Sequence, residues 1–175
     1  YFGIRNDINS DGTRFVVMSS TGGEVEVYQG ATNSWTQEDK LTSSNLGNAS
    51  QPGDVAISDD ATIVVIGRPY WSSEKGNLNI RTRSGSTWGY ASGGGSVTAS
   101  DGASYDKLGR SVGISGDGNY IMGGAPGDGS NTGAAYIYYQ GSTHTWSQQA
   151  KIVSTGGASS EQFGASCDID GDGTR

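Results

Sequence analysis

Short apolar stretches separated by polar turns recur along the whole chain, and none of them keeps the 3.6-residue period of an amphipathic helix over 12 residues. Apolar residues alternate at 55–57 and again at 112–114, as in a strand with one buried face. Uninterrupted apolar runs follow at 15–18, 63–66 and 120–124. Such runs are typical of strands that are covered on both faces. The pattern therefore predicts an all-β chain.

The alternating and continuous stretches belong to one repeating unit. Its anchors are Asp11, Asp60, Asp117 and Asp172, which are spaced by 49, 57 and 55 residues. A period of this length, with several strands in each period, is typical of the blades of a β-propeller. The expected units are 1–50 (repeat 1), 51–105 (repeat 2, degenerate), 106–160 (repeat 3) and 161–175 (the start of repeat 4).

Each complete unit is expected to hold four strands. A glycine opens the third strand at Gly23, Gly76 and Gly133. A polar turn then precedes a tryptophan that recurs in register, at Trp35, Trp88 and Trp146. This recurrence favours packing at the edge of a blade over the stacking of a ligand. The fourth strand is more polar than the others and should therefore lie outermost.

The stretches "FGASCDIDGDG" and "LGRSVGISGDGNYIMGGAPG" combine an aromatic- or leucine-glycine pair, an Asp-Gly turn and, in the second, a Gly-Ala-Pro segment. In these features the chain resembles the FG-GAP repeat family, the blade unit of the integrin alpha-subunit β-propeller. The third copy is the most complete, whereas the second has Gly67-Arg68-Pro69 in place of Gly-Ala-Pro. The resemblance implies β-propeller-type blades, each a four-stranded antiparallel sheet, with three repeats and the start of a fourth.

The aspartate loops have two interpretations. Alternate carboxylates before a glycine suit Ca²⁺, which binds several hard oxygen ligands, and metal-binding copies in the family place such residues at the first, third, fifth and ninth positions. The residues that match are Asp7, Asn9 and Asp11 in the first copy and Asp168, Asp170 and Asp172 in the last. The ninth position of the first copy is Phe15, however, and the same pattern is ordinary turn chemistry. A repeat turn is therefore the first interpretation, and a Ca²⁺ site is the second.

The charge of the chain narrows its partners. A net charge of −7 and a pI near 4.5 argue against nucleic acid, because phosphate binding needs clustered Lys and Arg. The segment contains no run of 18 apolar residues, so no membrane insertion is expected for it. His144 is the single histidine and Cys167 the single cysteine, so neither has a like partner for a zinc site or a disulfide. Cys167 takes a place that valine fills in two other copies, which favours an apolar role.

Thirty glycines, nine tyrosines and four tryptophans give the chain many turns and many aromatic side chains. Trp71 lies in the stretch "RPYWSSEKG", which has no aromatic counterpart in the other copies. With Tyr70 and Arg68 it forms a candidate site for a sugar or a protein, although a structural role for the pair is equally open. Asn48 begins the single N-glycosylation sequon, "NAS".

These observations favour a non-enzymatic extracellular or cell-surface module that mediates protein–protein contacts, adhesion or assembly. The alternative is a propeller module that binds a carbohydrate or another ligand through its loop aromatics. An enzyme ranks last, because no copy offers a paired acid and base apart from its turn residues. Three blades leave two open faces, so the expected partners are further blades of the same polypeptide or other protein chains, with glycans as a second class.

Overall fold

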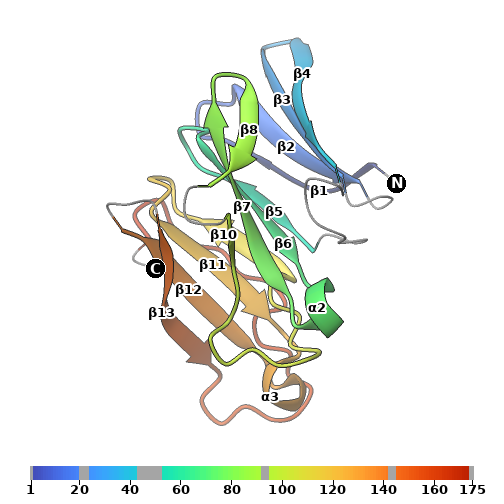
Figure 1. Cartoon of the computed structure of the whole chain (residues 1–175), viewed down its shortest axis with the longest axis vertical. Helices are drawn as coiled ribbons and strands as arrows, with labels where there is room; N and C mark the ends of the chain where they lie inside the picture. Colours follow the sequence, from blue (N-terminus) through green and yellow to red (C-terminus); the bar gives the residue numbers. More distant parts are fainter. Residues whose placement is uncertain (1, 20–23, 43–52, 92–94, 142–144, 174–175) are drawn as a thin grey trace.

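Three antiparallel sheets make up the protein, each a meander of consecutive strands (Figure 1). The structure, a computed structural model, describes residues 2–19, 24–42, 53–91, 95–141 and 145–173. We call the sheets blade 1, blade 2 and blade 3 in chain order. The predicted all-β fold of four-stranded blades is confirmed.

The strands have the following bounds. Blade 1 comprises β1 (Phe2–Ile8), β2 (Arg14–Ser19), β3 (Val25–Ala31) and β4 (Ser34–Leu41). Blade 2 comprises β5 (Val55–Ile57), β6 (Ile63–Arg68), β7 (Asn77–Ser84), β8 (Thr87–Tyr90) and β9 (Ser96–Val97). Blade 3 comprises β10 (Ser111–Ile114), β11 (Tyr120–Ala125), β12 (Ala134–Gln140) and β13 (Trp146–Val153).

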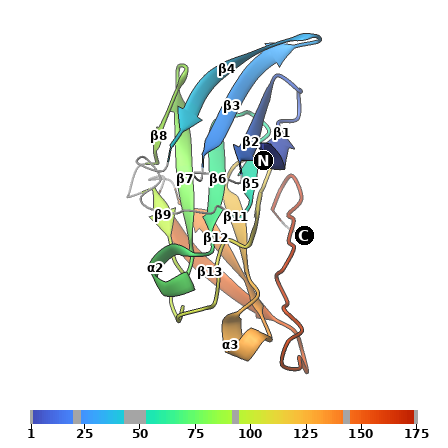
Figure 2. The same ribbon diagram turned by 90° about the vertical axis from the view of Figure 1, so that its right-hand side faces the viewer.

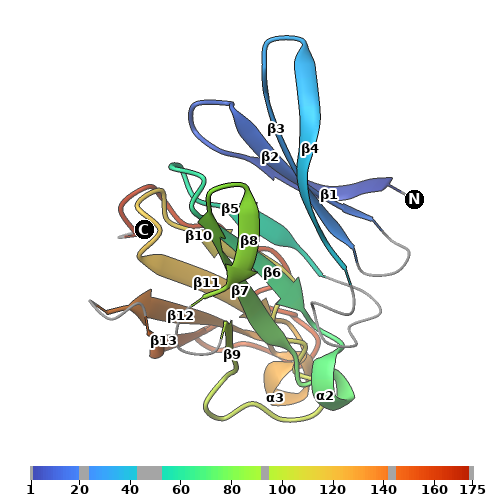
Figure 3. The same ribbon diagram turned by 45° about the horizontal axis from the view of Figure 1, so that its top comes forward.

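The three apolar runs of the sequence are the second strands of the blades, β2, β6 and β11. All of β6 is buried, because blade 2 has a neighbouring blade on each face. Figure 3 shows the β3–β4 hairpin of blade 1 extending away from the other two blades. The blades therefore pack most closely along their inner strands.

Two features depart from the pattern that the sequence predicts. The outermost strand of blade 2 is split, because β8 and β9 both pair with β7, at its end and at its start respectively. Two one-turn helical segments, α2 (Trp71–Glu74) and α3 (Asp128–Asn131), follow β6 and β11. Both contain left-handed residues, so neither shows the apolar periodicity from which a helix is predicted.

Two apolar cores hold the blades together. Blades 1 and 2 share the first, which contains Val16, Met18, Val25, Val27, Leu41, Val55, Ile57, Ala61, Val64, Ile66 and Trp88. Blades 2 and 3 share the second, whose larger members include Ile63, Val65, Leu78, Ile80, Leu108, Ile114, Ile121, Tyr136 and Tyr138. The apolar faces of blade 2 alternate along β6, so that Val64 and Ile66 meet blade 1 while Ile63 and Val65 meet blade 3.

The recurring tryptophans pack toward the preceding blade. Trp88 is 3% exposed in the core of blades 1 and 2, and Trp146 packs against the core of blades 2 and 3. The Trp88 indole N–H donates to Glu38 Oε2 at 3.3 Å, and its backbone N–H donates to Asp39 Oδ2 at 2.8 Å. Trp35 of blade 1 is 37% exposed, because the face on which it lies meets no described blade.

The anchor aspartates all close the same turn between the first and second strands. Asp11, Asp60 and Asp117 each accept a side-chain hydrogen bond from the residue two positions earlier and a backbone N–H from the residue two positions later. These bonds lower the pKa of Asp11, and at Asp60 and Asp117 they outweigh burial, which by itself would raise it. The turn interpretation of the sequence therefore describes all three complete copies.

The innermost strands β1, β5 and β10 lie side by side and are joined by carboxylates. The Ile57 backbone N–H of β5 donates to Asp7 Oδ2 of β1 at 2.9 Å. In the same way, the Val112 N–H of β10 donates to Asp54 Oδ2, just before β5, at 3.1 Å. Asp7 and Asp54 thus each bond the backbone of the next blade through one side chain.

Residues 163–173 follow blade 3 in the position that an inner strand of a next blade would take (Figure 2). Phe163 makes a parallel bridge to Gly133, and Ser111 Oγ donates to the Gly164 carbonyl at 2.9 Å. Ile169 of this segment is 9% exposed. Ile57 and Ile114, at the same position of their repeats, are 5% and 9% exposed, whereas Ile8 of blade 1 is 55% exposed.

Candidate functional site

Two loops join at one end of blades 2 and 3 and carry the most exposed aromatic residues of that end. The first is the turn after β6, with Tyr70 and α2, and the second is the crossover that leads from blade 2 to blade 3. Tyr70 is 42% exposed and Tyr105 is 65% exposed, while Trp71 is half-buried. We call Tyr70, Trp71 and Tyr105 the aromatic loop surface.

Backbone hydrogen bonds hold the two loops together. The crossover runs beside α2, and successive N–H groups donate to it: Tyr105 to the Ser73 carbonyl at 3.2 Å, Lys107 to Glu74 at 2.8 Å and Leu108 to Lys75 at 3.1 Å. The Lys107 ammonium also pairs with Glu74 at 3.4 Å. Because both side chains of this ion pair are about one-third exposed, the pair adds little stability. The backbone bonds position the aromatic side chains.

Both loops are held in a left-handed backbone conformation. Ser72, Ser73 and Glu74 have φ values of 50°, 58° and 61°, and Tyr105 and Lys107 have φ values of 73° and 62°. Positive φ is uncommon for residues other than glycine, and its accumulation is a feature of binding and switch segments. The same turn recurs after β11 at Gly129, Ser130 and Asn131, but without aromatic side chains.

A partly buried network lies beneath the crossover. The Tyr136 hydroxyl lies 2.8 Å from Asp128 Oδ2 and 2.9 Å from Asp101 Oδ1, and the Lys151 ammonium donates to both carboxylates at 2.8 and 2.7 Å. Burial and the two carboxylates raise the pKa of Tyr136 far above its usual value, so the phenol stays neutral. The hydrogen bond from Lys151 lowers the pKa of Asp101. The network fastens the crossover to α3 and β13.

The predicted ligand-binding residues separate in the structure. Tyr70 lies on the surface, but Arg68 at the end of β6 is 4% exposed and belongs to the interior of the protein. Tyr105, and not Arg68, lies beside the loop of Tyr70. The sequence pattern did not single out Tyr105. A signal was present, because Tyr105 lies three positions before Leu108-Gly109, just as Ser160 lies three positions before Phe163-Gly164. Both are left-handed residues.

The first predicted metal loop directs its polar groups to different partners. Asp7 accepts the N–H groups of Ile57 and Ile8, whereas Asn9 Nδ2 donates to Asp11 Oδ1 at 2.8 Å. Asn9 is also buried, and its Oδ1 accepts the Arg14 N–H. The described bonds of these three side chains therefore do not point to one shared ion, so this arrangement does not fit Ca²⁺ coordination by all three.

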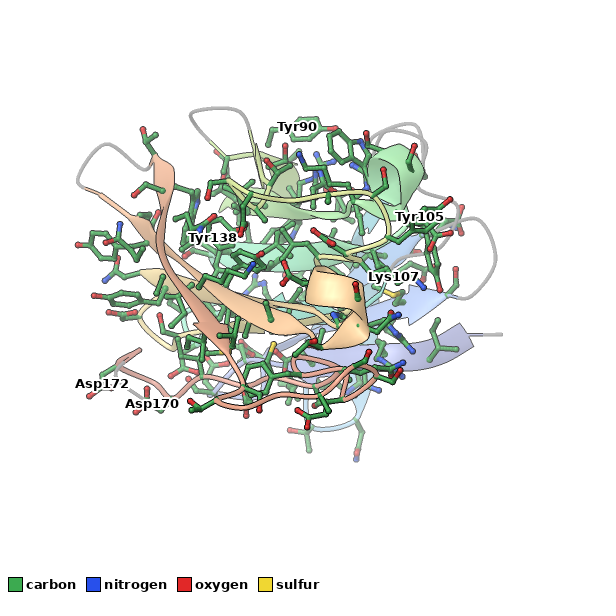
Figure 4. The ribbon with its side chains drawn as sticks, turned by 90° about the horizontal axis from the view of Figure 1, so that it is seen from below. Tyr90, Tyr105, Lys107, Tyr138, Asp170 and Asp172 are labelled. Atoms are coloured by element: carbon green, nitrogen blue, oxygen red, sulfur yellow. The ribbon has the colours of Figure 1, made fainter. Side chains whose placement is uncertain are left out.

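The last aspartate loop lies at the end of the blades opposite to the aromatic loop surface, as Figure 4 shows for Asp170 and Asp172 against Tyr105 and Lys107. Asp168 Oδ1 accepts the N–H of Ile169. Within the residues that the structure describes, no three His, Cys, Asp or Glu side chains gather as a metal-binding group. Ca²⁺ binding at this loop stays a prediction, which thermal unfolding with and without a chelator would test.

Three carboxylates, from repeats 1, 2 and 4, line a small pocket between the inner strands. Asp7, Asp54 and Asp168 surround a cavity of about 200 Å³. Burial raises the pKa of Asp7 and of Asp54, and the nearby charge of Asp168 adds to the effect at Asp7. Arg5 approaches Asp54 at 3.7 Å and offsets part of the effect. The inner edge of the blades is therefore acidic.

Two predicted positions fall outside the described residues. Asn48, the predicted glycosylation site, lies in 43–52, and His144 lies in 142–144. Cys167 is half-buried, and burial raises the pKa of its thiol, which disfavours the reactive thiolate. No helix in the described segments is both long and apolar enough to cross a membrane.

Comparison with solved structures shows the propeller-type fold. The chain is similar to Sqt1 of Saccharomyces cerevisiae, with a TM-score of 0.58 and 9% identity over 89% of this chain and 36% of that one. A candidate 6-phosphogluconolactonase from Bacteroides fragilis gives a TM-score of 0.61 and 16% identity over 85% and 38%. A functionally unknown protein from Desulfotomaculum acetoxidans gives 0.57 and 16% over 85% and 41%. The chain thus spans about two fifths of the length of these structures.

Sequence comparison assigns the repeat type. No curated protein matches the chain. A family model, described as the FG-GAP repeat, matches residues 95–138 and 146–174. The matched segments contain Leu108-Gly109 and Phe163-Gly164. In each of these dipeptides an apolar residue and a glycine contact the preceding blade. Residues 95–138 and 146–174 therefore carry the FG-GAP repeat that the sequence pattern suggested.

Proposed function

We propose that this protein is a non-enzymatic β-propeller module of the extracellular space or cell surface, which binds protein partners through the aromatic loop surface. The observation that carries the proposal is the exposure of Tyr70 and Tyr105 on two loops that are fixed to each other by backbone hydrogen bonds. Tyrosine and tryptophan are enriched at the energetic centres of protein interfaces. Fixed loops also lose little conformational entropy on binding.

The match to the FG-GAP repeat supports the proposal, since the resemblance to integrin-type blades implies protein–protein contact. An acidic surface favours partners that carry complementary basic groups. The partners proposed are other protein chains, including further blades, and glycans form the second class. A secretory location is a separate element, which a glycan on Asn48 in the protein from its native source would support.

A binding screen with matched variants tests the proposal. The intact chain is applied to an array of purified extracellular-matrix and cell-surface proteins, and each hit is repeated with the double variant Tyr70→Ser/Tyr105→Asn. Asparagine is chosen at Tyr105 because it tolerates the left-handed backbone. Trp35→Ser, which removes an exposed aromatic side chain from blade 1, is the control.

The expected result is a loss of binding by at least about tenfold in the double variant, because interface tyrosines each contribute on the order of 1–2 kcal/mol. The control should bind as the unaltered chain does. Equal binding by the double variant and the control would remove the aromatic loop surface from the proposal. Circular dichroism of each variant establishes that it is folded.

The carbohydrate alternative has less support from the geometry. It requires Arg68, Tyr70 and Trp71 to face one ligand, but Arg68 is buried and Tyr70 is exposed. Binding of the chain to a glycan array that disappears in Trp71→Ala would favour this alternative.

A further inference from the structure

A groove lies between blades 2 and 3, at the end opposite to the aromatic loop surface. It has a volume of about 510 Å³, within the ordinary range for small-molecule sites. The β5–β6 turn and the end of β7 form one wall, and the β10–β11 turn and the end of β12 form the other. Its polar walls present Asp60, Thr82, Arg83, Asp117, Asn119 and Gln140.

The donors of this groove are held in place by the turns on which they lie. Arg83 donates from Nε to the Ala61 carbonyl at 2.8 Å and from Nη1 to the Gly85 carbonyl at 3.3 Å. Gln140 Nε2 donates to the Gly118 carbonyl at 2.8 Å. Side chains that are already fixed lose little rotamer entropy when a ligand binds.

The two carboxylates are fixed in the same way. Asp60 Oδ1 accepts from Ser58 Oγ, from the Thr62 N–H and from Thr62 Oγ1, and Asp117 Oδ1 accepts from Ser115 Oγ and the Asn119 N–H. Among the described residues, Asp60 Oδ2 receives no hydrogen bond. The β5–β6 turn thus uses one oxygen of Asp60 and leaves the lone pairs of the second available. Asp117 Oδ2, by contrast, accepts from Asn119 Nδ2 at 2.7 Å.

The groove mixes charges of both signs. It holds two carboxylates, Asp60 and Asp117, and one guanidinium, Arg83. A neutral polar ligand can bond to groups of both kinds. It must also offer several donors and acceptors close together, because the groove presents a guanidinium, carboxylates, amides and hydroxyls on facing walls.

We propose that the groove between the β5–β6 and β10–β11 turns binds a neutral polyhydroxylated ligand, a saccharide unit, through Asp60, Thr82, Arg83 and Gln140. Its hydroxyls donate to Asp60 Oδ2 and Gln140 Oε1, and its oxygens accept from Arg83 Nη2 and Thr82 Oγ1. Ile63 supplies an apolar contact for the carbon face of the ring. This site is separate from the protein-binding surface of the proposed function, and either can fail without the other.

Nuclear magnetic resonance titration of the intact, ¹⁵N-labelled chain tests the site. The probes are glucose, galactose, mannose and N-acetylglucosamine with their β-linked disaccharides, and the readout is the shift of backbone N–H signals. At least one probe is expected to shift the signals of Thr62, Thr82 and Asn119, and to leave those of Tyr70 and Tyr105 in place. The absence of such shifts with every probe would overturn the proposal.

Two variants establish the polar contacts. Thr82→Val keeps the shape of the side chain and removes its hydroxyl, so the affinity is expected to fall about three- to tenfold, as for one neutral hydrogen bond. Asp60→Asn keeps an acceptor for the turn and changes the group that faces the ligand, so a similar loss is expected. Thr87→Val, an exposed position on β8, is the control and should bind normally.

Two further outcomes would also overturn the proposal. One is unchanged affinity in both Thr82→Val and Asp60→Asn. The other is a shift of the same signals by a trilysine peptide or by inorganic phosphate with none from the saccharides, which would identify a charged ligand instead. Folding of the variants is monitored in the same spectra, so a loss of structure is distinguished from a loss of binding.

Discussion

Gly67 of β6 and Gly109 of the next repeat lie so close that a methyl group added to Gly67 would collide with the carbonyl oxygen of Gly109. Gly124 and Gly164 stand in the same relation one repeat later. The first glycine of each pair opens the Gly-Ala-Pro or Gly-Arg-Pro segment, and the second follows Leu108 or Phe163. The two halves of the repeat signature therefore meet across a blade boundary.

Gly67→Ala is expected to destabilise the protein by about 1–3 kcal/mol, as overpacking at a tight contact does. The neighbouring backbone of Gly109 is held by the bond from its N–H to the Gly124 carbonyl at 2.9 Å, so it has little freedom to move aside. Urea unfolding measures the change. Gly89→Ala on β8, where an added Cβ meets nothing within 4 Å, is the control and should stay within about 0.5 kcal/mol of the unaltered chain.

Two tryptophans at the same repeat position should differ in their contribution to stability. Trp88→Ala removes a side chain that is 3% exposed and should cost about 3–5 kcal/mol. Trp35→Ala removes one that is 37% exposed and contacts Phe15 edge-on, so its cost should be about 1 kcal/mol. Thermal or urea unfolding of both variants compares the two costs. Equal costs would mean that Trp88 does not join blades 1 and 2.

Lys151→Met should loosen the crossover to blade 3. The substitution leaves the buried carboxylate of Asp128 without its cation, and the expected loss is about 1–2 kcal/mol. Hydrogen exchange should rise at the N–H groups of Tyr105 and Lys107. Lys40→Met, which breaks an exposed pair with Glu24, should leave stability nearly unchanged. Normal protection of the crossover in Lys151→Met would contradict this account.

The pH dependence of stability should have opposite signs at Asp54 and Asp60. Burial raises the pKa of Asp54 above 3.8, so the folded protein holds this proton more tightly than the unfolded chain, and stability falls as pH rises through that range. Asp54→Asn should therefore raise the free energy of unfolding above that of the unaltered chain at pH 7. The increase should be smaller at pH 3. The control is the reverse case, Asp60.

At Asp60, burial raises the pKa, but the bonds from Thr62 and Ser58 outweigh it, and the pKa is lowered. The stability from this carboxylate is present above about pH 4 and is lost as pH falls through the lowered pKa. Asp60→Asn should thus destabilise the protein at pH 7, and the difference should shrink at pH 3. Urea unfolding at pH 3, 5 and 7 measures both variants. Parallel pH profiles would refute the assignment.

The strand pattern was predictable from the sequence, because burial imposes a period on residues that are neighbours in the chain. The run at 63–66 indicated a strand covered on both faces, and β6 is buried throughout. The Asp-Gly turns were equally clear, since Asp60 bonds to groups within two residues. Hydrogen bonds between residues that are close in the chain can be predicted from the residue pattern.

The aromatic loop surface was only half predictable. Tyr70 and Trp71 were singled out by their unusual loop, but Tyr105 joins them through backbone bonds between segments about 30 residues apart. The burial of Arg68 and the division of the outer strand into β8 and β9 also depend on contacts between strands. No short-range period records such contacts; only the position of Tyr105 in the repeat, three residues before Leu108-Gly109, pointed to that residue.

The Ile57 N–H donates to Asp7, and the Val112 N–H donates to Asp54, so the same kind of bond joins blade 1 to blade 2 and blade 2 to blade 3. Blade 2 donates one such bond, from the Ile57 N–H, toward blade 1 and accepts one, at Asp54, from blade 3. Its apolar residues also alternate between these two faces. A duplicate of blade 2 spliced between blades 2 and 3 would meet a compatible surface on either side. The array can thus grow by whole repeats, by gene duplication or by engineering, without a new interface having to be invented.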